Sequence, residues 1–270
     1  MSNRRDVLKA LGAAVALASG WPRSAGAAVD GGPTVEAIKK RGALKVGWGI
    51  WFPYLYRDPN SKQLTGISTD IFTEMARSMN VRLEFVEDSW STLIAGLQAG
   101  KFDTAVPLAI TAERQKAVDF SAPIAKETTD MVVRKEDVGK YSSWRELDVP
   151  GKKITTTLGS NTQFLLQRSF KNAELVLVKA GPDSISALAS KRADAWAAVH
   201  STVKYALKEH PQLGVIPGEV LAAEPIAFIV KPGDAGFKAW LNEFVGQMKT
   251  SGALLKIFQK YELDVSSMPD

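Results

Sequence analysis

The chain alternates two hydrophobic periods along most of its length, and this alternation is the strongest constraint on its fold. Residues 81–86 alternate with the period of two that is typical of a strand, whereas residues 68–79 carry apolar side chains at helical spacing. The same order of strand and helix returns between residues 153 and 209. Strands that alternate with helices of this length predict an α/β fold built on mainly parallel sheet.

Gly, Pro and capping residues set the expected boundaries of these elements. We expect strands at residues 43–46, 81–86, 102–106, 153–157, 175–178, 193–198 and 227–230, and helices at residues 34–41, 68–79, 90–97, 162–170, 183–190, 201–209 and, broken near Gly252, 237–261. Segments 121–129 and 217–225 combine loop signals with extended flanks. Two such crossings predict two lobes that are each discontinuous in sequence.

The first 27 residues have the three-part layout of an export signal. A basic segment contains the pair Arg4 and Arg5, an apolar run follows at residues 10–20, and small residues precede a cleavage site near Ala27. As a helix the apolar run would rise about 16 Å, too little for a bilayer core of roughly 30 Å. Residues 3–9 also resemble the twin-arginine export consensus. We therefore expect a twin-arginine signal peptide and a periplasmic product, the alternatives being a general secretory signal or a basic tail.

Composition excludes several kinds of functional site. The chain has no cysteine and two histidines, which excludes thiolate metal sites and leaves little room for a zinc site or a Ser-His-Asp triad. The formal net charge is +5, but removal of residues 1–27 leaves 30 basic and 28 acidic residues, a net charge of +2. Neither a basic stripe nor an aromatic-basic repeat is present, so we expect no nucleic-acid partner, and we also expect no metal and no cofactor.

Six short motifs occur in an order and spacing that resemble one protein family. They are residues 42–47 (GALKVG), 66–70 (GISTD), 90–103 (WSTLI to LQAGKFD), 110–123 (ITAER to VDFSAP), 158–162 (LGSNT) and 191–195 (KRADA). Together they resemble the family 3 extracytoplasmic solute-binding proteins, the amino-acid receptors of ABC importers, over about residues 34–264. The resemblance implies a two-lobed periplasmic-binding-protein fold of type II, whose two crossing hinge strands let the lobes close on a small ligand. It assigns residues 33–125 and 226–270 to lobe 1 and residues 126–225 to lobe 2.

Arg114 is the first candidate for ligand binding. Thr111 is a predicted helix N-cap, which places Arg114 in the first helical turn, where an exposed cation opposes the helix macrodipole at a cost of roughly 0.3–1 kcal/mol. The resemblance implies that Arg114 clamps the ligand carboxylate. A guanidinium suits this role because its planar fork donates two parallel hydrogen bonds. The alternative is a solvated surface arginine.

Other candidates belong to the same expected cleft. A helix that opens directly after a strand offers free backbone N–H groups, and it predicts either an anion site or an ordinary capped turn at Gly159, Ser160 and Asn161. The resemblance implies that Trp51 and Trp90 pack against the ligand side chain, with core packing as the alternative for Trp90. Weaker candidates in the same aromatic segment are Trp48 and Tyr54.

The sequence departs from the family pattern where an acid would bind the ligand ammonium. The two acidic positions correspond here to Val199 and Gly49, and two hydroxyl-bearing positions correspond to Pro107 and Ala109. A backbone carbonyl such as that of Pro107 can accept from an amine, but a buried ammonium without a countercharge is costly. We therefore expect a carboxylate ligand whose amine is weakly read, modified or absent, and whose side chain is apolar or aromatic. His200 either donates to the ligand or, as we prefer, caps the helix near residue 201.

Three classes of function remain, and we favour the first. It is a monomeric, non-catalytic binding protein that captures an amino acid or related small carboxylate and delivers it to the membrane permease of an ABC importer. The second is an enzyme similar to periplasmic cyclohexadienyl dehydratase, which needs a general acid in the cleft, whereas residues 195–204 contain none. The third is a sensor subunit, although such domains are usually fused to a transmembrane helix.

Overall fold

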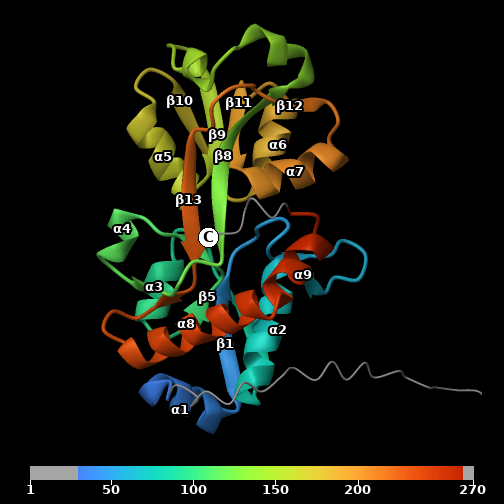
Figure 1. The fold of residues 1–270 in the computed structure, drawn as a ribbon. Helices are drawn as coiled ribbons and strands as arrows, with labels where there is room; N and C mark the ends of the chain where they lie inside the picture. The colour runs from blue at the N-terminus through green and yellow to red at the C-terminus, as the bar shows by residue number, and fades with distance from the viewer. Residues whose placement is uncertain (1–29, 264–270) are drawn as a thin grey trace, which may run out of the picture.

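Two groups of helices and strands lie one above the other, and two long strands run between them (Figure 1). The structure is a computed structural model that describes residues 30–263, so the expected signal peptide at residues 1–27 lies outside the described residues. The two connecting strands are β8 (Ala125–Arg134) and β13 (Ala222–Ala227). They overlap the crossing segments predicted at residues 121–129 and 217–225.

The lower group, called lobe 1 here, is built on a three-stranded parallel sheet. The strand order is β4-β1-β5, that is Arg82–Glu87, Ala43–Trp48 and Thr104–Ala105. The helices of this lobe are α1 (Gly32–Arg41), α2 (Ile67–Met79), α3 (Leu93–Gln98), α4 (Ala112–Gln115), α8 (Ala235–Thr250) and α9 (Ala253–Lys260). The predicted apolar face of α2 is buried, because Ile71, Phe72 and Met75 are at most 1% exposed.

The upper group, called lobe 2 here, shares a seven-stranded sheet with the crossing strands. The order is β10-β9-β11-β8-β13-β6, and β12 pairs with β8. The strands other than β8 and β13 are β6 (Leu108–Ala109), β9 (Lys153–Thr157), β10 (Glu174–Val178), β11 (Ala195–Val199) and β12 (Leu213–Val215). Helices α5 (Asn161–Ser169), α6 (Gly181–Ala189) and α7 (His200–Glu209) complete the lobe, with two 3-10 helices at Lys135–Lys140 and Trp144–Leu147.

This larger sheet is mixed rather than mainly parallel. Strands β10, β9 and β11 are parallel, as the alternating pattern predicts, whereas β8 is antiparallel to β11, β12 and β13. The difference arises because the chain leaves lobe 1 along β8 and returns along β13, so these two strands necessarily run in opposite directions. Parallel connections are confined to the segments where a helix joins successive strands.

The buried side chains fall into clusters that follow the two lobes. One cluster draws its members from residues 35–125 and 226–263, and two others draw theirs from residues 131–221. These clusters support the predicted lobe boundaries after residues 125 and 225, which we retain as a proposal.

Element boundaries differ from the predictions at a few places. The helix expected at residues 90–97 begins at Leu93, the strand expected at residues 102–106 is limited to Thr104–Ala105, and the strand expected at residues 227–230 is divided between β13 and β14 (Ile229–Val230). Short strands β2 (Tyr56–Arg57), β3 (Leu64–Thr65) and β7 (Asp119–Phe120) complete the described elements. No helix within residues 30–263 is long and apolar enough to cross a membrane.

Candidate functional site

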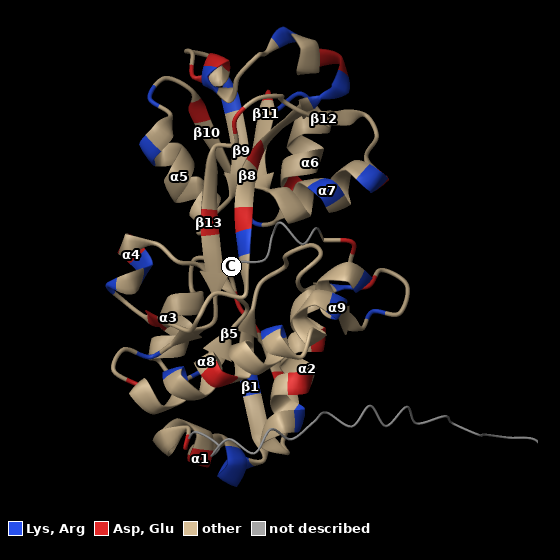
Figure 2. Ribbon diagram, viewed as in Figure 1, with Lys and Arg blue, Asp and Glu red and all other residues tan. Residues whose placement is uncertain are grey.

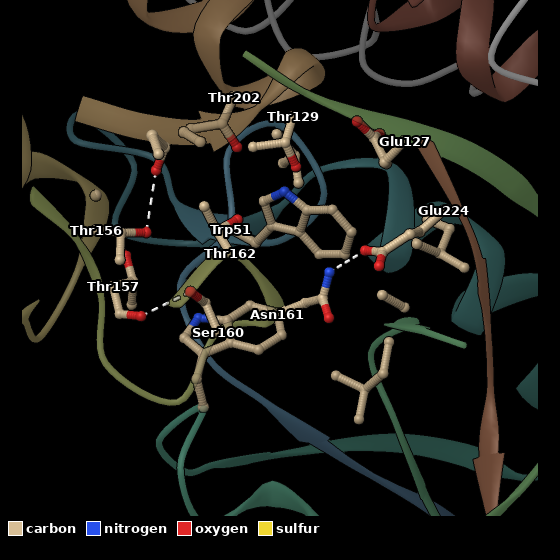
Figure 3. A pocket seen from close by; sticks show the side chains of 18 of the residues that line it. Trp51, Glu127, Thr129, Thr156, Thr157, Ser160, Asn161, Thr162, Thr202 and Glu224 are labelled. Atoms are coloured by element: carbon tan, nitrogen blue, oxygen red, sulfur yellow. Dashed lines mark hydrogen bonds between the residues drawn. The ribbon is translucent and has the colours of Figure 1, made fainter. Parts of the chain in front are cut away.

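A cavity of about 100 Å³ lies where the crossing strands meet the two lobes (Figure 3). Its apolar wall is largely aromatic and contains Ile50, Trp51, Phe52, Trp90, Leu108, Trp196 and Ile226. Its charged and hydroxyl-bearing lining consists of Arg114, Glu127, Thr129, Thr156, Thr157, Ser160, Thr162, Thr202 and Glu224. An apolar cavity with a few convergent polar groups is typical of a small-molecule site.

Arg114 is buried against this cavity without an acidic partner. The predicted N-cap is confirmed, since the backbone N–H of Arg114 donates to Thr111 Oγ1 at 3.2 Å. The residue is 8% exposed, and its Nη1 donates to the carbonyl oxygen of Ala109 at 3.3 Å. Within residues 30–263 no ion pair involves Arg114. The alternative of a solvated surface arginine is therefore wrong.

Burial governs the electrostatics of Arg114. It lowers the pKa of the guanidinium to about 10, although the negative charge of Glu224 opposes this shift. Arg114 thus stays protonated near neutral pH. A buried cation that forms no ion pair within the described residues is unfavourable, and an anionic group of a ligand would offset this cost.

The N-terminus of α5 faces the same cavity from lobe 2. Ser160 is its N-cap and accepts from the backbone N–H of Gln163 at 3.2 Å. Asn161 and Thr162 are the first two residues of the helix, so their backbone N–H groups have no partner within it, and both residues line the cavity. The predicted residues Ser160 and Asn161 thus meet Arg114 at one cavity.

Gly159 does not offer the cavity the free backbone N–H group that the sequence predicts. Its backbone N–H donates to Gln163 Oε1 at 2.7 Å, and the residue lies outside the cavity lining. The prediction that Gly159 offers a free N–H group is wrong, because the side chain of Gln163 folds back to accept from it.

The predicted aromatic wall is present. The ring of Trp51 stacks on that of Tyr54 with centroids 3.9 Å apart and meets Trp90 edge-on at 5.7 Å. Trp90 lies in the turn before α3 and both lines the cavity and packs on the core of lobe 1. The weaker candidates Trp48 and Tyr54 are 1% and 0% exposed and belong to that core rather than to the lining.

His200 does not line the cavity, and neither predicted role fits it. Helix α7 begins at His200 itself, with Val199 as N-cap and no side-chain capping bond. The His200 Nδ1 atom lies 2.7 Å from Asp130 Oδ2 instead. This contact follows from sheet pairing, because β11 places Val199 opposite Thr129 and thereby brings the next residue to the neighbouring strand. Val199 itself lines the cavity, as predicted.

Pro107 and Ala109 also line the cavity, as predicted. The carbonyl of Ala109 already accepts from Arg114, which ties the short strand β6 to the guanidinium. Neither residue has a hydroxyl group, so neither supplies the one that the family pattern places there.

The two family positions for an acid, Val199 and Gly49, carry none, but two glutamates from elsewhere in the chain line the cavity. Glu224 lies on β13, half-buried, and accepts a hydrogen bond from Asn161 Nδ2 (Figure 3). Burial raises the pKa of Glu224, although the Asn161 amide and the positive charges of Arg168 and Arg114 oppose the shift. The acid comes from a crossing strand rather than from either family position.

Glu127 is the second acid, and it is more deeply buried. It lies on β8, is 5% exposed, and accepts from Tyr54 OH at 2.9 Å and from the backbone N–H of Ser201 at 3.3 Å. Burial raises the pKa of Glu127 to about 7, although these donors and His200 oppose the shift. Its buried partner is affected too, since burial and the Glu127 charge raise the pKa of Tyr54.

Comparison with known proteins decides the family. Residues 44–264 match the bacterial extracellular solute-binding proteins, family 3. The chain belongs to this family. It is 28% identical to the L-cystine-binding protein TcyA of Bacillus subtilis over 232 residues, which cover 83% of this chain and 83% of that protein.

Solved structures of amino-acid-binding proteins resemble most of this chain. The ancestral amino acid-binding protein AncCDT-1, a precursor of cyclohexadienyl dehydratase, is 30% identical with a TM-score of 0.80, covering 84% of this chain and 99% of that one. The amino acid ABC transporter substrate-binding protein AbpA from Streptococcus pneumoniae, bound to L-arginine, is 25% identical with a TM-score of 0.78, covering 87% and 100%. All three relatives are binding proteins, and the type II periplasmic-binding-protein fold predicted from the sequence is confirmed.

In this solute-binding protein both acids of the cavity lining, and Thr129 beside them, lie on the crossing strands, where the sequence does not predict site residues. Glu127, Thr129 and Glu224 were not singled out, because no local motif distinguishes them. The available signal was the presence of acids inside segments already predicted to cross the cleft. The described residues contain no cluster of His, Cys, Asp and Glu that could hold a metal ion.

Proposed function

We propose that this protein is the periplasmic binding component of an ABC importer and that it captures an amino acid between its lobes. The single observation that carries the proposal is Arg114, a cavity-lining cation that is 8% exposed and forms no ion pair within the described residues. The names of the relatives support it, since they bind L-cystine, L-arginine or, more generally, amino acids.

The α-carboxylate of the ligand binds between the lobes. Arg114 of lobe 1 donates through its guanidinium, while the backbone N–H groups of Asn161 and Thr162 donate from the start of α5 in lobe 2. Negative charge is also favoured at a helix N-terminus by the helix macrodipole. Because one anion takes hydrogen bonds from both lobes, its binding stabilises the closed arrangement.

The α-ammonium of the ligand binds Glu224. This carboxylate lies near enough to Arg114 to affect its pKa, so the two groups match the adjacent opposite charges of a zwitterion. Asn161 Nδ2 donates to the same carboxylate and fixes its position. The countercharge that the family pattern would place at Val199 or Gly49 is thus supplied from β13.

The remaining parts of the proposal concern location and partners. The signal at residues 1–27 exports the chain to the periplasm, where it acts as a monomer and delivers its ligand to a membrane permease. Trp51 and Trp90 form the wall against which the ligand side chain packs. No catalytic step and no cofactor is part of this function.

Thermal unfolding and calorimetry with a panel of amino acids and their deaminated analogues test the proposal. We expect at least one free amino acid to bind, and a ligand at 100 times its Kd to raise the stability by about 2.7 kcal/mol. Its deaminated analogue should bind much more weakly, because Glu224 would lose its cation. Equal binding of both, or binding of no amino acid in the panel, would refute the proposal.

A further inference from the structure

The proposed function leaves one buried acid of the cavity without a ligand partner. Glu127 and Glu224 lie directly opposite each other in the antiparallel pairing of β8 and β13, and both line the cavity. Figure 2 shows acidic positions on both crossing strands between the lobes. Side chains that are directly opposite in such a pair point to the same face, with Cβ atoms about 4.5–5.5 Å apart.

The charges of the cavity lining do not balance. Arg114 supplies one positive charge, whereas Glu127 and Glu224 together supply two negative charges when ionised. A neutral zwitterion would satisfy Arg114 with its carboxylate and Glu224 with its ammonium. Glu127 would then remain a buried acid without a counterion, which is costly unless it binds a proton.

The protein itself provides no fixed cation for Glu127. Its hydrogen-bond partners are the phenol of Tyr54, from the aromatic segment of lobe 1, and the backbone N–H of Ser201, from α7. The charged groups that face it are Glu224 on the neighbouring strand and His200, whose ring is held by Asp130. Within the described residues no Lys or Arg forms a hydrogen bond or an ion pair with Glu127.

We propose that the cavity selects a cationic amino acid, with the side-chain cation of the ligand held by Glu127. This inference rests on the proposed function, since it takes Arg114 and Glu224 as the groups that bind the zwitterionic end. It adds a substrate class, namely basic amino acids of the lysine or arginine type. It also names Glu127 as a residue that determines specificity.

The spacing of the three groups suits such a ligand. Arg114 is anchored on Ala109 of β6, Glu224 lies on β13 and Glu127 on β8, and these are successive strands of one sheet. Ala109 lies opposite Ile226 of β13, two residues from Glu224, and Glu224 lies opposite Glu127 of β8, so in strand order Glu224 comes between the anchor of the guanidinium and Glu127. A basic amino acid presents a carboxylate, an adjacent ammonium and, some carbon atoms further, a second cation in the same order.

The walls around Glu127 also suit a basic side chain. The ring of Trp51, stacked on Tyr54, borders the cavity near the acid, and Trp196 borders it from β11. Apolar walls accommodate the methylene stem of such a side chain, and aromatic faces attract its cation. The acid and the rings thus favour the same ligand class.

Isosteric ligand pairs separate charge from size. We would measure calorimetric affinities of the exported chain for L-arginine against L-citrulline and for L-lysine against L-norleucine, at a pH above the pKa of Glu127. The cationic member of each pair should bind on the order of tenfold to a hundredfold more tightly. Glu127→Gln should bring each ratio close to one while leaving the affinity for the neutral member similar or improved.

A matched control tests whether the effect is local. Glu113→Gln makes the same change on the exposed surface of α4, where the carboxylate pairs with Lys116, and it should leave the ratios unchanged. The number of protons released on binding distinguishes the two roles, because a glutamate with a purely structural role would release none when the ligand binds. In wild type, binding of lysine near neutral pH should release protons, and the number released follows from the binding enthalpies measured in buffers of different ionisation enthalpy. Glu127→Gln should abolish this release.

Two outcomes would overturn the inference without touching the proposed function. One is a wild-type protein that binds the neutral member of each pair as tightly as the cationic one. The other is a folded Glu127→Gln variant that keeps the full preference for the cation. If no amino acid of either kind binds, the proposed function fails instead.

Discussion

Glu127 on β8 and Glu224 on β13 are direct cross-strand partners in the two strands that join the lobes. Like charges in this position destabilise an antiparallel pair, and burial raises the pKa of both carboxyls. When both are ionised, the pair places two negative charges between the lobes, near the buried Arg114, which forms no ion pair within residues 30–263. We expect a ligand that carries both signs of charge to relieve both costs at once and thereby to favour the closed arrangement of the lobes.

Arg114→Ala should abolish most of the ligand affinity without unfolding the protein. Removal of one partner of a buried charge pair typically costs 2–5 kcal/mol of binding energy, so we expect a loss of about 30-fold to more than 1,000-fold in Kd. The melting temperature without ligand should stay the same or rise, because the variant no longer buries an unpaired cation. Arg77→Ala is the control, since that side chain is 66% exposed on α2. If Arg114→Ala instead fails to fold in the absence of ligand, Arg114 has a structural role.

Glu224→Gln should weaken amino acids selectively. The substitution keeps the shape and the contact with Asn161 but removes the countercharge for the ligand ammonium. We expect the affinity for an amino acid to fall at least about tenfold, and that for its deaminated analogue to stay the same or rise. Calorimetry on both ligands measures the difference, and a parallel loss for the two ligands would contradict the role assigned to Glu224.

The pKa of Glu127 predicts a stability that falls as the pH rises. Burial raises this pKa from an ordinary value of 4.5 to about 7 in the folded state, so the folded state holds its proton more tightly than the unfolded state. The contribution is fully present below pH 4.5 and is lost as the pH rises through about 7. Its size is on the order of 3 kcal/mol.

Urea unfolding at a series of pH values checks this contribution. Glu127→Gln has no ionisable group at this position. The difference in the free energy of unfolding, variant minus wild type, should therefore increase between pH 4.5 and somewhat above 7 and then level off. Ligand must be absent, because any bound cation would stabilise the ionised form. A difference between variant and wild type that does not change with pH would show that Glu127 already ionises normally.

Gly159→Ala should impair lobe closure. Gly159 has φ +77°, and a Cβ atom added there would lie 2.4 Å from the backbone nitrogen of Ser91 in the opposite lobe. Gly151→Ala is a matched control, because Gly151 has φ +84° but no atom within 4 Å of an added Cβ. Both variants should lose about 1 kcal/mol of stability from the left-handed conformation. Only Gly159→Ala should also lose ligand affinity and the ligand-induced compaction measured by small-angle scattering.

Local sequence patterns predict much of the fold and part of the candidate site. The helical spacing in α2, the N-cap at Thr111 and the helix that opens at Ser160 were predictable, because each depends on residues a few positions apart. Arg114 was found in the same way, as a cation in a helical turn where it is locally unfavourable. The prediction for His200 is wrong because its partner, Asp130, is distant in sequence. The prediction for Gly159 is wrong although its partner, Gln163, is only four residues away, because the pattern does not specify that the Gln163 side chain folds back to the backbone.

Local sequence patterns predict an α/β chain with two crossings and identify Arg114 as a candidate for binding an anion. The two acids of the cleft come together only in the folded chain, because Glu127 and Glu224 are far apart in sequence and meet through the pairing of β8 with β13. Strand register sets which side chains lie opposite each other, and no hairpin turn joins β8 to β13 to fix that register locally. Burial in the resulting cavity then raised the pKa of both acids and turned two ordinary glutamates into the groups that we expect to select the ligand.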